Sequence, residues 1–215
     1  MINFSELLVK HISTSIDKDV WGEGDTDETY HPSYIGYCPR QFVLTKSRII
    51  KPSQTLKGIF YLGKWGHVLM QSLVEDVCEI EKKIRIDIPD SNLYITGSID
   101  AIDKDNIVYD FKTKSTIKYM TSNVKDEHKI QAMTYMYAIK GKRGSIIYID
   151  KTTLATKQIA FNYNENIMTR VFAKIKKIHP KYLEWKATGF DLTKIPYPKC
   201  KCMMCRYEKL PEVEK

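Results

Sequence analysis

The stretch LYITGSIDAIDKDNIVYDFKT, residues 93–113, decides the fold class of this 215-residue chain. Leu93–Ala101 and Ile107–Thr113 predict two strands, because both segments are rich in β-branched and aromatic residues. A tight turn at Asp103–Asn106 separates them, and this spacing predicts an antiparallel hairpin. The fold is therefore expected to contain a sheet whose neighbouring strands carry both apolar and charged side chains.

The charged residues of this hairpin predict a metal site. Asp110 and Lys112 are two positions apart and share one face of the second strand, with Cα atoms about 6.6 Å apart. If the loop is Lys104–Asn106, Asp100 lies opposite Asp110, which is unfavourable unless a proton or a divalent cation lies between the carboxylates. A two-residue loop would instead turn Asp100 to the other face. In the first register, Mg²⁺ or Mn²⁺ would bind Asp100, Asp110, the backbone carbonyl of Phe111 and water.

Such a site suits phosphodiester hydrolysis. The metal polarises the phosphodiester and lowers the pKa of a bound water, and Lys112 orients or deprotonates that water and offsets the growing charge. The alternative is a surface salt bridge, which is the commoner role of an Asp-x-Lys triplet. The sequence GSID, ten residues before Asp110, favours the catalytic interpretation.

The remaining patterns complete an α/β chain. Residues 79–88 alternate between isoleucine and charged side chains and predict a half-buried strand. The other expected elements are a helix over Gly58–Cys78 with an apolar stripe of Leu62, Trp65, Leu69, Leu73 and Val77, a helix over Asp126–Lys140, a hairpin of Ser145–Asp150 and Lys157–Asn162, and a helix over Glu165–Ile178. Short helices are also expected at Ile2–His11 and after Pro39. The order αβββαββα predicts a mixed central sheet flanked by helices.

Three helical side chains are candidates for the site. Gln131 and Tyr135 lie four residues apart on one helix face, where they can hydrogen-bond to each other and to a substrate. A buried ring with a solvated hydroxyl at the edge of an amphipathic helix is the alternative. His67 is either an additional metal ligand or a histidine packed on its helix face.

The five cysteines indicate a second metal site. Cys200, Cys202 and Cys205 lie within six residues, and an odd number of cysteines argues against a disulfide framework. Clustered thiolates with such short gaps are typical metal ligands, and a fourth ligand would complete a Cys₄ set. Cys78, at a helix end, is expected to be a buried thiol.

Charge and hydropathy restrict the class of protein. The chain has 34 Lys and Arg against 26 Asp and Glu, a net charge of +8, which fits nucleic acid or simply a solvated lysine-rich surface. With 43% apolar residues the chain can form a core, so disordered and low-complexity classes are excluded. The longest uncharged stretch, Thr29–Pro39, is much shorter than the roughly 20 residues that span a bilayer. With no secretory signal in MINFSELLVKHIS, a soluble cytoplasmic protein without a membrane partner is expected.

These motifs occur in an order that resembles one known group of enzymes. G-x₃-H (Gly63–His67), G-x-x-D (Gly97–Asp100), D-x-K (Asp110–Lys112) and Q-x₃-Y (Gln131–Tyr135) resemble the RecB branch of the PD-(D/E)XK nuclease superfamily. YCPR at Tyr37–Arg40, followed by a late cysteine cluster, resembles the iron–sulfur nucleases of the fourth CRISPR-associated family and their viral and phage homologues. The match runs from about Tyr37 to Cys205.

The resemblance implies a restriction-endonuclease-like core and a metal-dependent DNA nuclease, typically an exonuclease on single strands or DNA ends. It assigns His67, Asp100 and Asp110 to the catalytic metal, Lys112 to catalysis, and Gln131 and Tyr135 to substrate positioning. Lys114, Lys118 and Lys125 follow the active strand and are candidates for phosphate contacts, with solvated loop lysines as the alternative. Self-association and DNA-processing or CRISPR-adaptation partners are compatible with the resemblance.

The resemblance also implies that Cys38 joins Cys200, Cys202 and Cys205 on a 4Fe–4S cluster. Here the spacing C-x-C-x₂-C differs from the usual C-x₂-C followed by a longer gap, so the role of Cys202 stays open and zinc is an alternative. One compact unit is expected, with an N-terminal helical region (1–57), a nuclease core (58–190) and a cysteine segment (191–215).

Two other functions compete with the nuclease. A non-catalytic nucleic-acid-binding protein with a structural zinc site explains the charge and the thiols, but it leaves the facing aspartates unexplained. A redox iron–sulfur protein leaves the Asp-x-Lys triplet unused. Cleavage polarity, the balance of endonuclease and exonuclease activity, and a cellular or viral origin do not follow from the residues.

Overall fold

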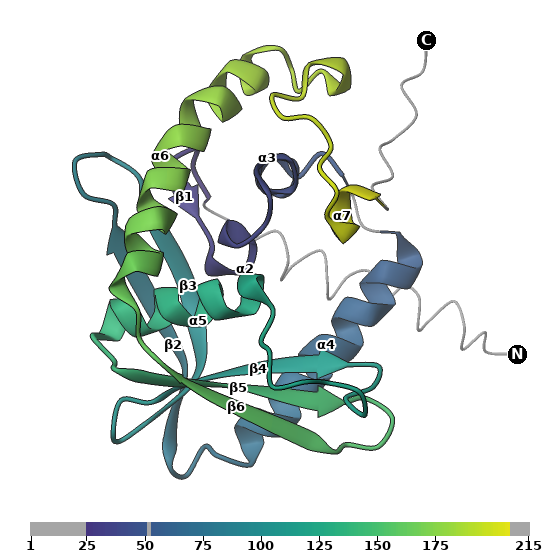
Figure 1. The fold of residues 1–215 in the computed structure, drawn as a ribbon, viewed down its shortest axis with the longest axis vertical. Coiled ribbons are helices and arrows are strands. Elements are labelled where there is room, and N and C mark those ends of the chain that lie inside the picture. The colour runs from purple at the N-terminus through teal and green to yellow at the C-terminus, as the bar shows by residue number, and fades with distance from the viewer. Residues whose placement is uncertain (1–24, 51–52, 207–215) are drawn as a thin grey trace, which may run out of the picture.

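A mixed β-sheet lies at the centre of the protein (Figure 1). The computed structural model describes residues 25–50 and 53–206, so the helix expected at Ile2–His11 lies outside the described residues. The strands are β1 (Thr29–Tyr30), β2 (Cys78–Asp87), β3 (Tyr94–Asp103), β4 (Val108–Lys114), β5 (Arg143–Asp150) and β6 (Thr156–Asn162).

The strand pairing explains why the sheet is mixed. Strand β3 pairs antiparallel with β2 and β4, and its start pairs parallel with β1. Strands β4 and β5 are parallel, and β5 forms an antiparallel hairpin with β6. A parallel pair needs a crossover connection, and here a loop followed by a helix supplies it. The expected hairpins and the mixed sheet are confirmed.

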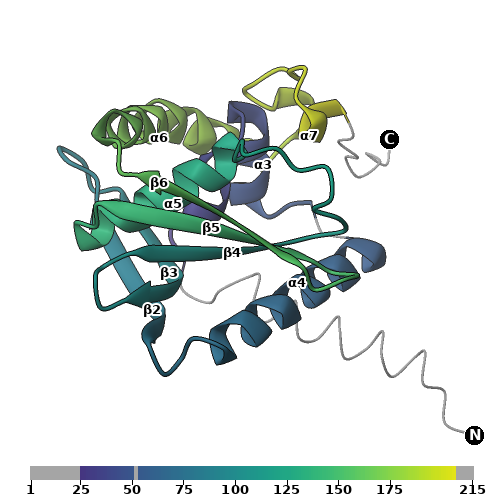
Figure 2. The same cartoon turned by 60° about the horizontal axis from the view of Figure 1, so that its bottom comes forward.

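Helices cover both faces of the sheet (Figure 2). Helix α4 lies on one face, whereas α5 and α6 cover the other face together with α3. The helices are α2 (Pro32–Ile35), α3 (Pro39–Ser47), α4 (Gln54–Ser72), α5 (Asp126–Ile139), α6 (Glu165–Ala187) and α7 (Met203–Arg206), with a 3₁₀ turn at Leu192–Lys194. None of the helices in the described ranges is both long and apolar enough to cross a membrane.

The main core lies between the sheet and helices α2, α3, α5 and α6. It includes the fully buried side chains of Ile35, Phe42, Ile95 and Met133. A smaller cluster, which contains Phe111, faces α4. The sheet is thus buried on both faces where β4 crosses its centre. Charged side chains at this point are shielded from water.

Helix α4 contradicts the expected packing. The expected helix was Gly58–Cys78, but α4 ends at Ser72, so Leu73 and Val77 lie beyond it and are exposed. Within the helix, Leu62 is exposed and Trp65 is 57% exposed. The helix instead approaches the sheet through Gly66, where an added Cβ would lie 2.5 Å from Thr113 Cγ2. Close approach of the helix backbone to the Thr113 side chain selects for the absence of a side chain at Gly66, which a search for apolar periodicity cannot detect.

Two other expectations need correction. Helix α6 continues past Ile178 to Ala187 with Pro180 in its interior. Its apolar face continues too, because Tyr182 and Trp185 are buried in the main core and offset the cost of the proline. Cys78 is half-buried at the start of β2 rather than fully buried.

Candidate active site and cysteine cluster

Two aspartates meet where strands β3 and β4 separate. The observed register pairs Ala101 with Tyr109 and Ile102 with Val108, so Asp100 is next in line opposite Asp110. This is the register expected for the longer hairpin loop. Next to the two paired residues, Oδ2 of Asp100 accepts a hydrogen bond from the backbone N–H of Phe111 at 2.7 Å. The Asp100 side chain is nearly buried and that of Asp110 is completely buried.

Lys112 forms an ion pair with Asp110. Its Nζ lies 2.9 Å from Oδ1 and 2.8 Å from Oδ2 of the carboxylate. Oδ2 nevertheless has no hydrogen-bond partner among the described residues. Burial raises the pKa of Asp110, and the charge of Asp100 adds to this, whereas the Lys112 ammonium lowers it; the net direction is upward. A buried carboxylate oxygen without a hydrogen bond is the kind of group that a cation would satisfy.

Helix α4 carries His67 to the same place. Its Nδ1 lies 3.4 Å from Oδ1 of Asp100, and its ring meets that of Phe111 edge-on. Burial opposes ionisation of Asp100, but the neighbouring His67 outweighs it, so the pKa of Asp100 lies below its usual value. Burial likewise lowers the pKa of His67, but Asp100 raises it more. His67 is therefore a neighbour of the two aspartates and not only a packed side chain.

Asp100, Asp110 and His67 are the predicted ligands of a divalent cation. Mg²⁺ binds oxygen ligands at 2.0–2.1 Å in octahedral geometry, so neighbouring ligand atoms lie about 3 Å apart. The separation of 3.4 Å between His67 and Asp100 is close to that value. Among the described residues, only the four cysteines have ligand atoms that all lie as close together as an ion needs. Asp100, Asp110, His67 and the carbonyl of Phe111 therefore stay predicted ligands.

Helix α5 adds the Gln131–Tyr135 pair. Nε2 of Gln131 donates to the Tyr135 hydroxyl at 3.0 Å. Burial, followed by the charges of Asp110 and Asp100, raises the pKa of Tyr135 well above its usual value. The Tyr135 hydroxyl is thus neutral, and the negative charges of both aspartates act on it. The pair therefore lies within electrostatic range of both carboxylates, and its role in substrate positioning stays a prediction.

Glu81 and Gln71 belong to the surroundings of the site, and Glu81 is exposed, as the alternation in β2 predicted. Glu81 has a left-handed backbone, with φ of 52°. Its carboxylate accepts hydrogen bonds from Ser98 Oγ and from Gln71 Nε2, the latter at 2.5 Å. Gln71 also donates to the Asp100 carbonyl at 3.4 Å. No sequence pattern signals this backbone conformation at a glutamate.

A second pair that sequence reasoning missed lies beside Lys112. The parallel register places Tyr148 of β5 next to Lys112, and Nδ1 of His128 lies 2.9 Å from the Tyr148 hydroxyl. Burial, with smaller contributions from Lys112, Lys125 and Lys114, lowers the pKa of His128 to about 3. His128 lies three residues before Gln131, and this helical spacing is the signal that could have identified it.

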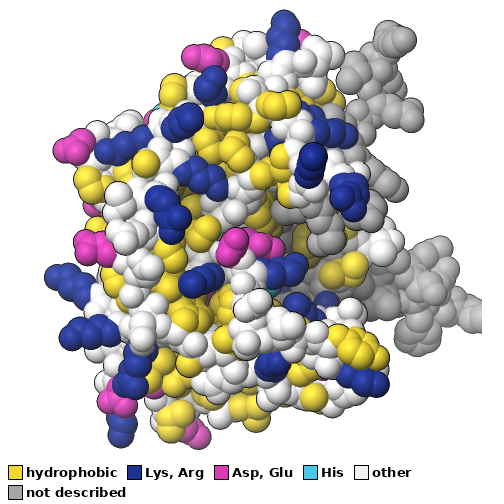
Figure 3. Space-filling model, in the orientation of Figure 1, with side chains coloured by type: hydrophobic (Ala, Val, Ile, Leu, Met, Phe, Trp, Pro, Cys, Tyr) yellow, Lys and Arg dark blue, Asp and Glu magenta, His cyan; other side chains and the backbone are white. Residues whose placement is uncertain are grey.

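The three candidate DNA-binding lysines follow the end of β4. The Nζ of Lys114 lies 4.9 Å from the centre of the Tyr148 ring. Lys118 is exposed in the loop, and Lys125 is the N-cap of α5, with its Nζ 3.6 Å from Glu127. Figure 3 shows basic side chains, mixed with some acidic ones, at several points on this face of the molecule. Lys114 ends the strand that carries Lys112, and Lys125 caps the helix that carries Gln131. Lys118 lies in the loop between these two elements.

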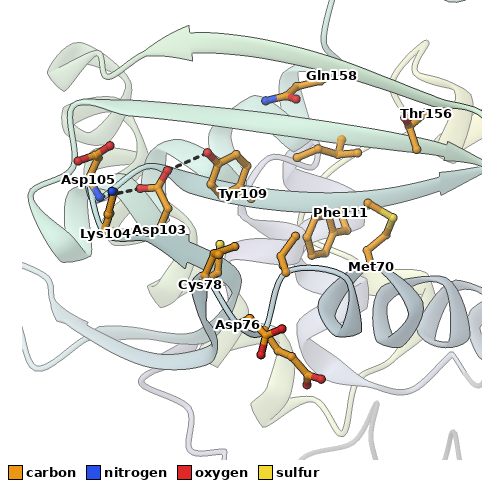
Figure 4. A pocket seen from close by; sticks show the side chains of 14 residues that line it. Met70, Asp76, Cys78, Asp103, Lys104, Asp105, Tyr109, Phe111, Thr156 and Gln158 are labelled. Carbon is orange, nitrogen blue, oxygen red and sulfur yellow. Dashed lines mark hydrogen bonds between the residues drawn. The ribbon is translucent and has the colours of Figure 1, made fainter.

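A cavity of about 900 Å³ lies on the opposite face of the sheet (Figure 4). Apolar side chains such as Met70 and Phe111 line it, with Cys78 and the hydrogen-bonded pair Asp103 and Tyr109. The candidate catalytic side chains do not line this cavity. The cavity is therefore separate from the aspartate–lysine site.

Four cysteines converge at one end of the molecule. Cys38 is the N-cap of α3, which opens with Pro39 as the sequence predicted, and it meets the cysteines around α7 (Figure 1). The sulfur of Cys38 lies 3.6 Å from that of Cys205 and 3.7 Å from that of Cys202, and Cys200 lies 3.7 Å from Cys205. All four sulfurs lie within 4.8 Å of one another.

A metal ion suits this arrangement. Burial raises the pKa of Cys38 to about 12, and hydrogen bonds from the other thiols contribute. Four thiolates can therefore share this space only around a cation. Zn–S bonds of about 2.3 Å in a tetrahedron place sulfurs about 3.8 Å apart, close to the separations seen here.

Comparisons with known proteins agree with this geometry. A model of the PD-(D/E)XK nuclease superfamily matches residues 77–210. The solved structure of SSO0001 is similar with a TM-score of 0.62 at 18% identity, covering 82% of this chain and 85% of that protein. An alkaline exonuclease, LHK-Exo from Laribacter hongkongensis, is similar with a TM-score of 0.52 at 13% identity, covering 77% and 95%.

The structure of LHK-Exo in complex with dAMP is likewise similar, with a TM-score of 0.51 at 14% identity, covering 75% of this chain and 93% of that protein. At these identities, the likeness concerns the fold. No curated protein sequence matched the chain. The family model covers more than half of the residues and includes β2 through the cysteine cluster. The chain belongs to the PD-(D/E)XK nuclease superfamily.

Proposed function

We propose that this protein is a Mg²⁺- or Mn²⁺-dependent deoxyribonuclease that acts on single-stranded DNA or DNA ends, mainly as an exonuclease. The observation that carries the proposal is the convergence of Asp100, Asp110 and His67 beside the Lys112 ammonium in a chain of this superfamily. The order of the four motifs and the Cys₄ set support placement near the RecB-like, CRISPR-associated nucleases and their viral homologues. The dAMP complex of LHK-Exo fits a DNA substrate for that relative.

The candidate metal ligands and Lys112 would have separate roles in phosphodiester cleavage. Asp100, Asp110 and His67 would hold the metal, which polarises the phosphodiester and lowers the pKa of water. The Nζ of Lys112 lies within ion-pair distance of both oxygens of Asp110, so its first contribution would be to offset the negative charge that grows on the phosphoryl oxygens. Lys112 would also orient the attacking water.

Residues around this centre would bind the DNA. Gln131 and Tyr135 present a hydrogen-bonding edge next to the aspartates and would position the nucleotide. Lys114, Lys118 and Lys125 would contact phosphates along the strand that enters the site.

End-labelled single- and double-stranded DNA, incubated with Mg²⁺, Mn²⁺ or EDTA, tests the activity. The wild-type protein is expected to degrade single strands with either metal and not in EDTA. Lys112→Ala and the near-isosteric Asp110→Asn are expected to abolish cleavage, whereas Asp105→Ala in the exposed hairpin turn serves as the matched control. Circular dichroism at the assay temperature verifies the fold of each variant. Undiminished cutting by both site variants would refute the proposal.

The cysteine cluster would be a structural metal centre that fastens residues 191–215 to the N-terminal helical region (1–57), beside the core of residues 58–190. The resemblance favours a 4Fe–4S cluster, whereas the sulfur separations favour one tetrahedral ion, because a cubane places several atoms between its thiolates. We favour the single ion on this geometry. Anaerobic purification decides: colourless protein with one zinc supports the ion, and brown protein with about four irons supports the cubane.

A non-catalytic nucleic-acid-binding protein with a structural zinc site is the second candidate, and the spacing of the sulfurs is compatible with both functions. Metal titration separates the two functions. A protein that only binds DNA retains it without turnover at every Mg²⁺ or Mn²⁺ concentration. Turnover that saturates with metal supports the nuclease.

A further inference from the structure

The loop that joins β4 to α5, residues 115–125, is held firmly against the sheet. Its side chains Ile117, Met120 and Val124 pack against the buried cluster of Ile146 and Tyr148. The backbone N–H of Ile117 donates to Oδ2 of Asp150 at 3.1 Å, and the Met120 carbonyl accepts from Lys157 Nζ at 2.6 Å. These two contacts fix residues 117–120 against the sheet.

Tyr119 lies between these two anchors and points outward. Its side chain is 81% exposed, and no large apolar or aromatic side chain in the described ranges is more exposed. Lys118 is its nearest cationic neighbour, with Nζ 5.4 Å from the ring centre. An aromatic ring that is presented to solvent on an anchored loop, with an ammonium beside it, has both components of a single-strand contact: a stacking surface and a phosphate ligand.

The position of the loop connects it to the candidate active site. It leaves the carboxyl end of β4 three residues after Lys112, at the edge of the parallel β4–β5 pair where open α/β sheets bind ligands. It ends at Lys125, and Lys112, Lys114 and Lys125 are all close enough to His128 to act on its charge. Lys112, Lys114 and Lys125 therefore lie around His128, close to where the loop ends.

We propose that Tyr119 stacks on one base of a single-stranded segment whose phosphates pass Lys118, Lys114 and Lys125 on the way to Lys112. The proposal rests on the proposed function, which it deepens by naming a residue that recognises an unpaired base. Bases in a duplex are already stacked on their neighbours, so Tyr119 favours single strands and frayed ends. Removal of one base-stacking ring weakens binding roughly 5- to 150-fold.

Binding of single-stranded oligonucleotides that carry 2-aminopurine tests this without cleavage. The probe is titrated with protein in Ca²⁺ and, separately, in EDTA, and its fluorescence reports stacking. Tyr119→Ala is expected to raise Kd by that factor and to lose the quenching, whereas Tyr119→Phe and Tyr119→Trp keep both. Trp65→Ala, which removes another exposed aromatic ring from α4, is the matched control and is expected to bind like wild type.

An abasic oligonucleotide completes the design. Wild type is expected to lose affinity when the stacked base is absent, and Tyr119→Ala is expected to be insensitive to that loss, because both changes remove the same contact. Equal binding of base-containing DNA by Tyr119→Ala and wild type, or equal sensitivity of both to the abasic site, would overturn the proposal.

The same measurements separate this proposal from the nuclease. Tyr119-dependent quenching without cleavage in Mn²⁺ would refute the nuclease and leave the stacking site intact. Metal-dependent cleavage with no effect of Tyr119 on binding would refute the stacking site alone. Wild-type protein that binds no single-stranded DNA would refute both.

Discussion

Gly66 of α4 and Thr113 of β4 are in such close contact that a β-carbon on Gly66 would lie 2.5 Å from Thr113 Cγ2. The next residue along the helix is His67, whose ring reaches Asp100. The distance between the helix and the sheet therefore sets the position of one of the candidate metal ligands.

Gly66→Ala tests this contact. The added methyl group must push α4 from the sheet, so we expect the free energy of unfolding to fall by about 1–3 kcal/mol and metal-dependent cleavage to fall with it. Gly58→Ala in the same helix meets nothing within 4 Å and is expected to stabilise the protein by up to about 1 kcal/mol. Urea denaturation measures both. Equal effects of the two substitutions would show that the contact does not restrict the helix.

The ion pair between Lys112 and Asp110 predicts a stability effect that is separate from catalysis. Lys112→Ala leaves a fully buried carboxylate without its cation, and we expect a loss of about 3–5 kcal/mol in the free energy of unfolding. Replacing both residues, in Lys112→Ala with Asp110→Asn, removes the buried charge and is expected to recover part of the loss. A double-mutant cycle by chemical denaturation checks this, and additive losses would contradict it.

Removal of the metal from the cysteine cluster should destabilise the whole chain. Cys38→Ser, or a strong chelator, is expected to cost at least about 3 kcal/mol, which is roughly 6–12 °C in Tm for a chain of this size. Cys78→Ser, at a half-buried thiol outside the cluster, is the control and is expected to shift Tm little. Differential scanning calorimetry, paired with metal analysis, measures both; similar shifts for the two variants would argue against a structural metal.

His128 predicts a pH dependence of stability. Its pKa is lowered to about 3 in the folded protein and is about 6.5 when unfolded, so between these values the unfolded chain binds more protons. The free energy of unfolding therefore falls as the pH falls below about 6.5, and this residue contributes up to about 2 kcal/mol of loss between pH 7 and pH 5.

His128→Gln is expected to remove that part of the pH dependence. The comparison is made by urea denaturation at pH 7, 6 and 5, and the remaining histidines are common to both proteins. Parallel pH profiles for wild type and variant would contradict the expectation.

The sequence predicted the arrangement of the candidate residues wherever strand alternation and motif spacing determine it. The separation of two between Asp110 and Lys112 places both on one face, and the hairpin loop then brings Asp100 opposite Asp110. The Gln131–Tyr135 contact follows in the same way from helical periodicity. These features depend on residues that are close in sequence or joined by one turn, and local rules describe them well.

The rest depends on contacts that local rules do not contain. The face of α4 was predicted incorrectly because glycines, not the leucines, contact the sheet. The turn of Glu81 towards Gln71 arises from a left-handed backbone that the alternation of β2 conceals. The His128–Tyr148 bond joins a helix to a strand twenty positions away, and only the parallel register of β4 and β5 places it beside Lys112.

The convergence of Cys38 with three cysteines more than 160 positions later has a consequence for cleaved forms of the protein. With all four thiolates on one metal centre, the intervening chain is a closed ring. A protease that cuts one surface loop within this ring would produce two fragments that migrate together under native conditions. A chelator would remove the link at the metal centre, and only the packing of the core and the strand pairing would then hold the fragments together.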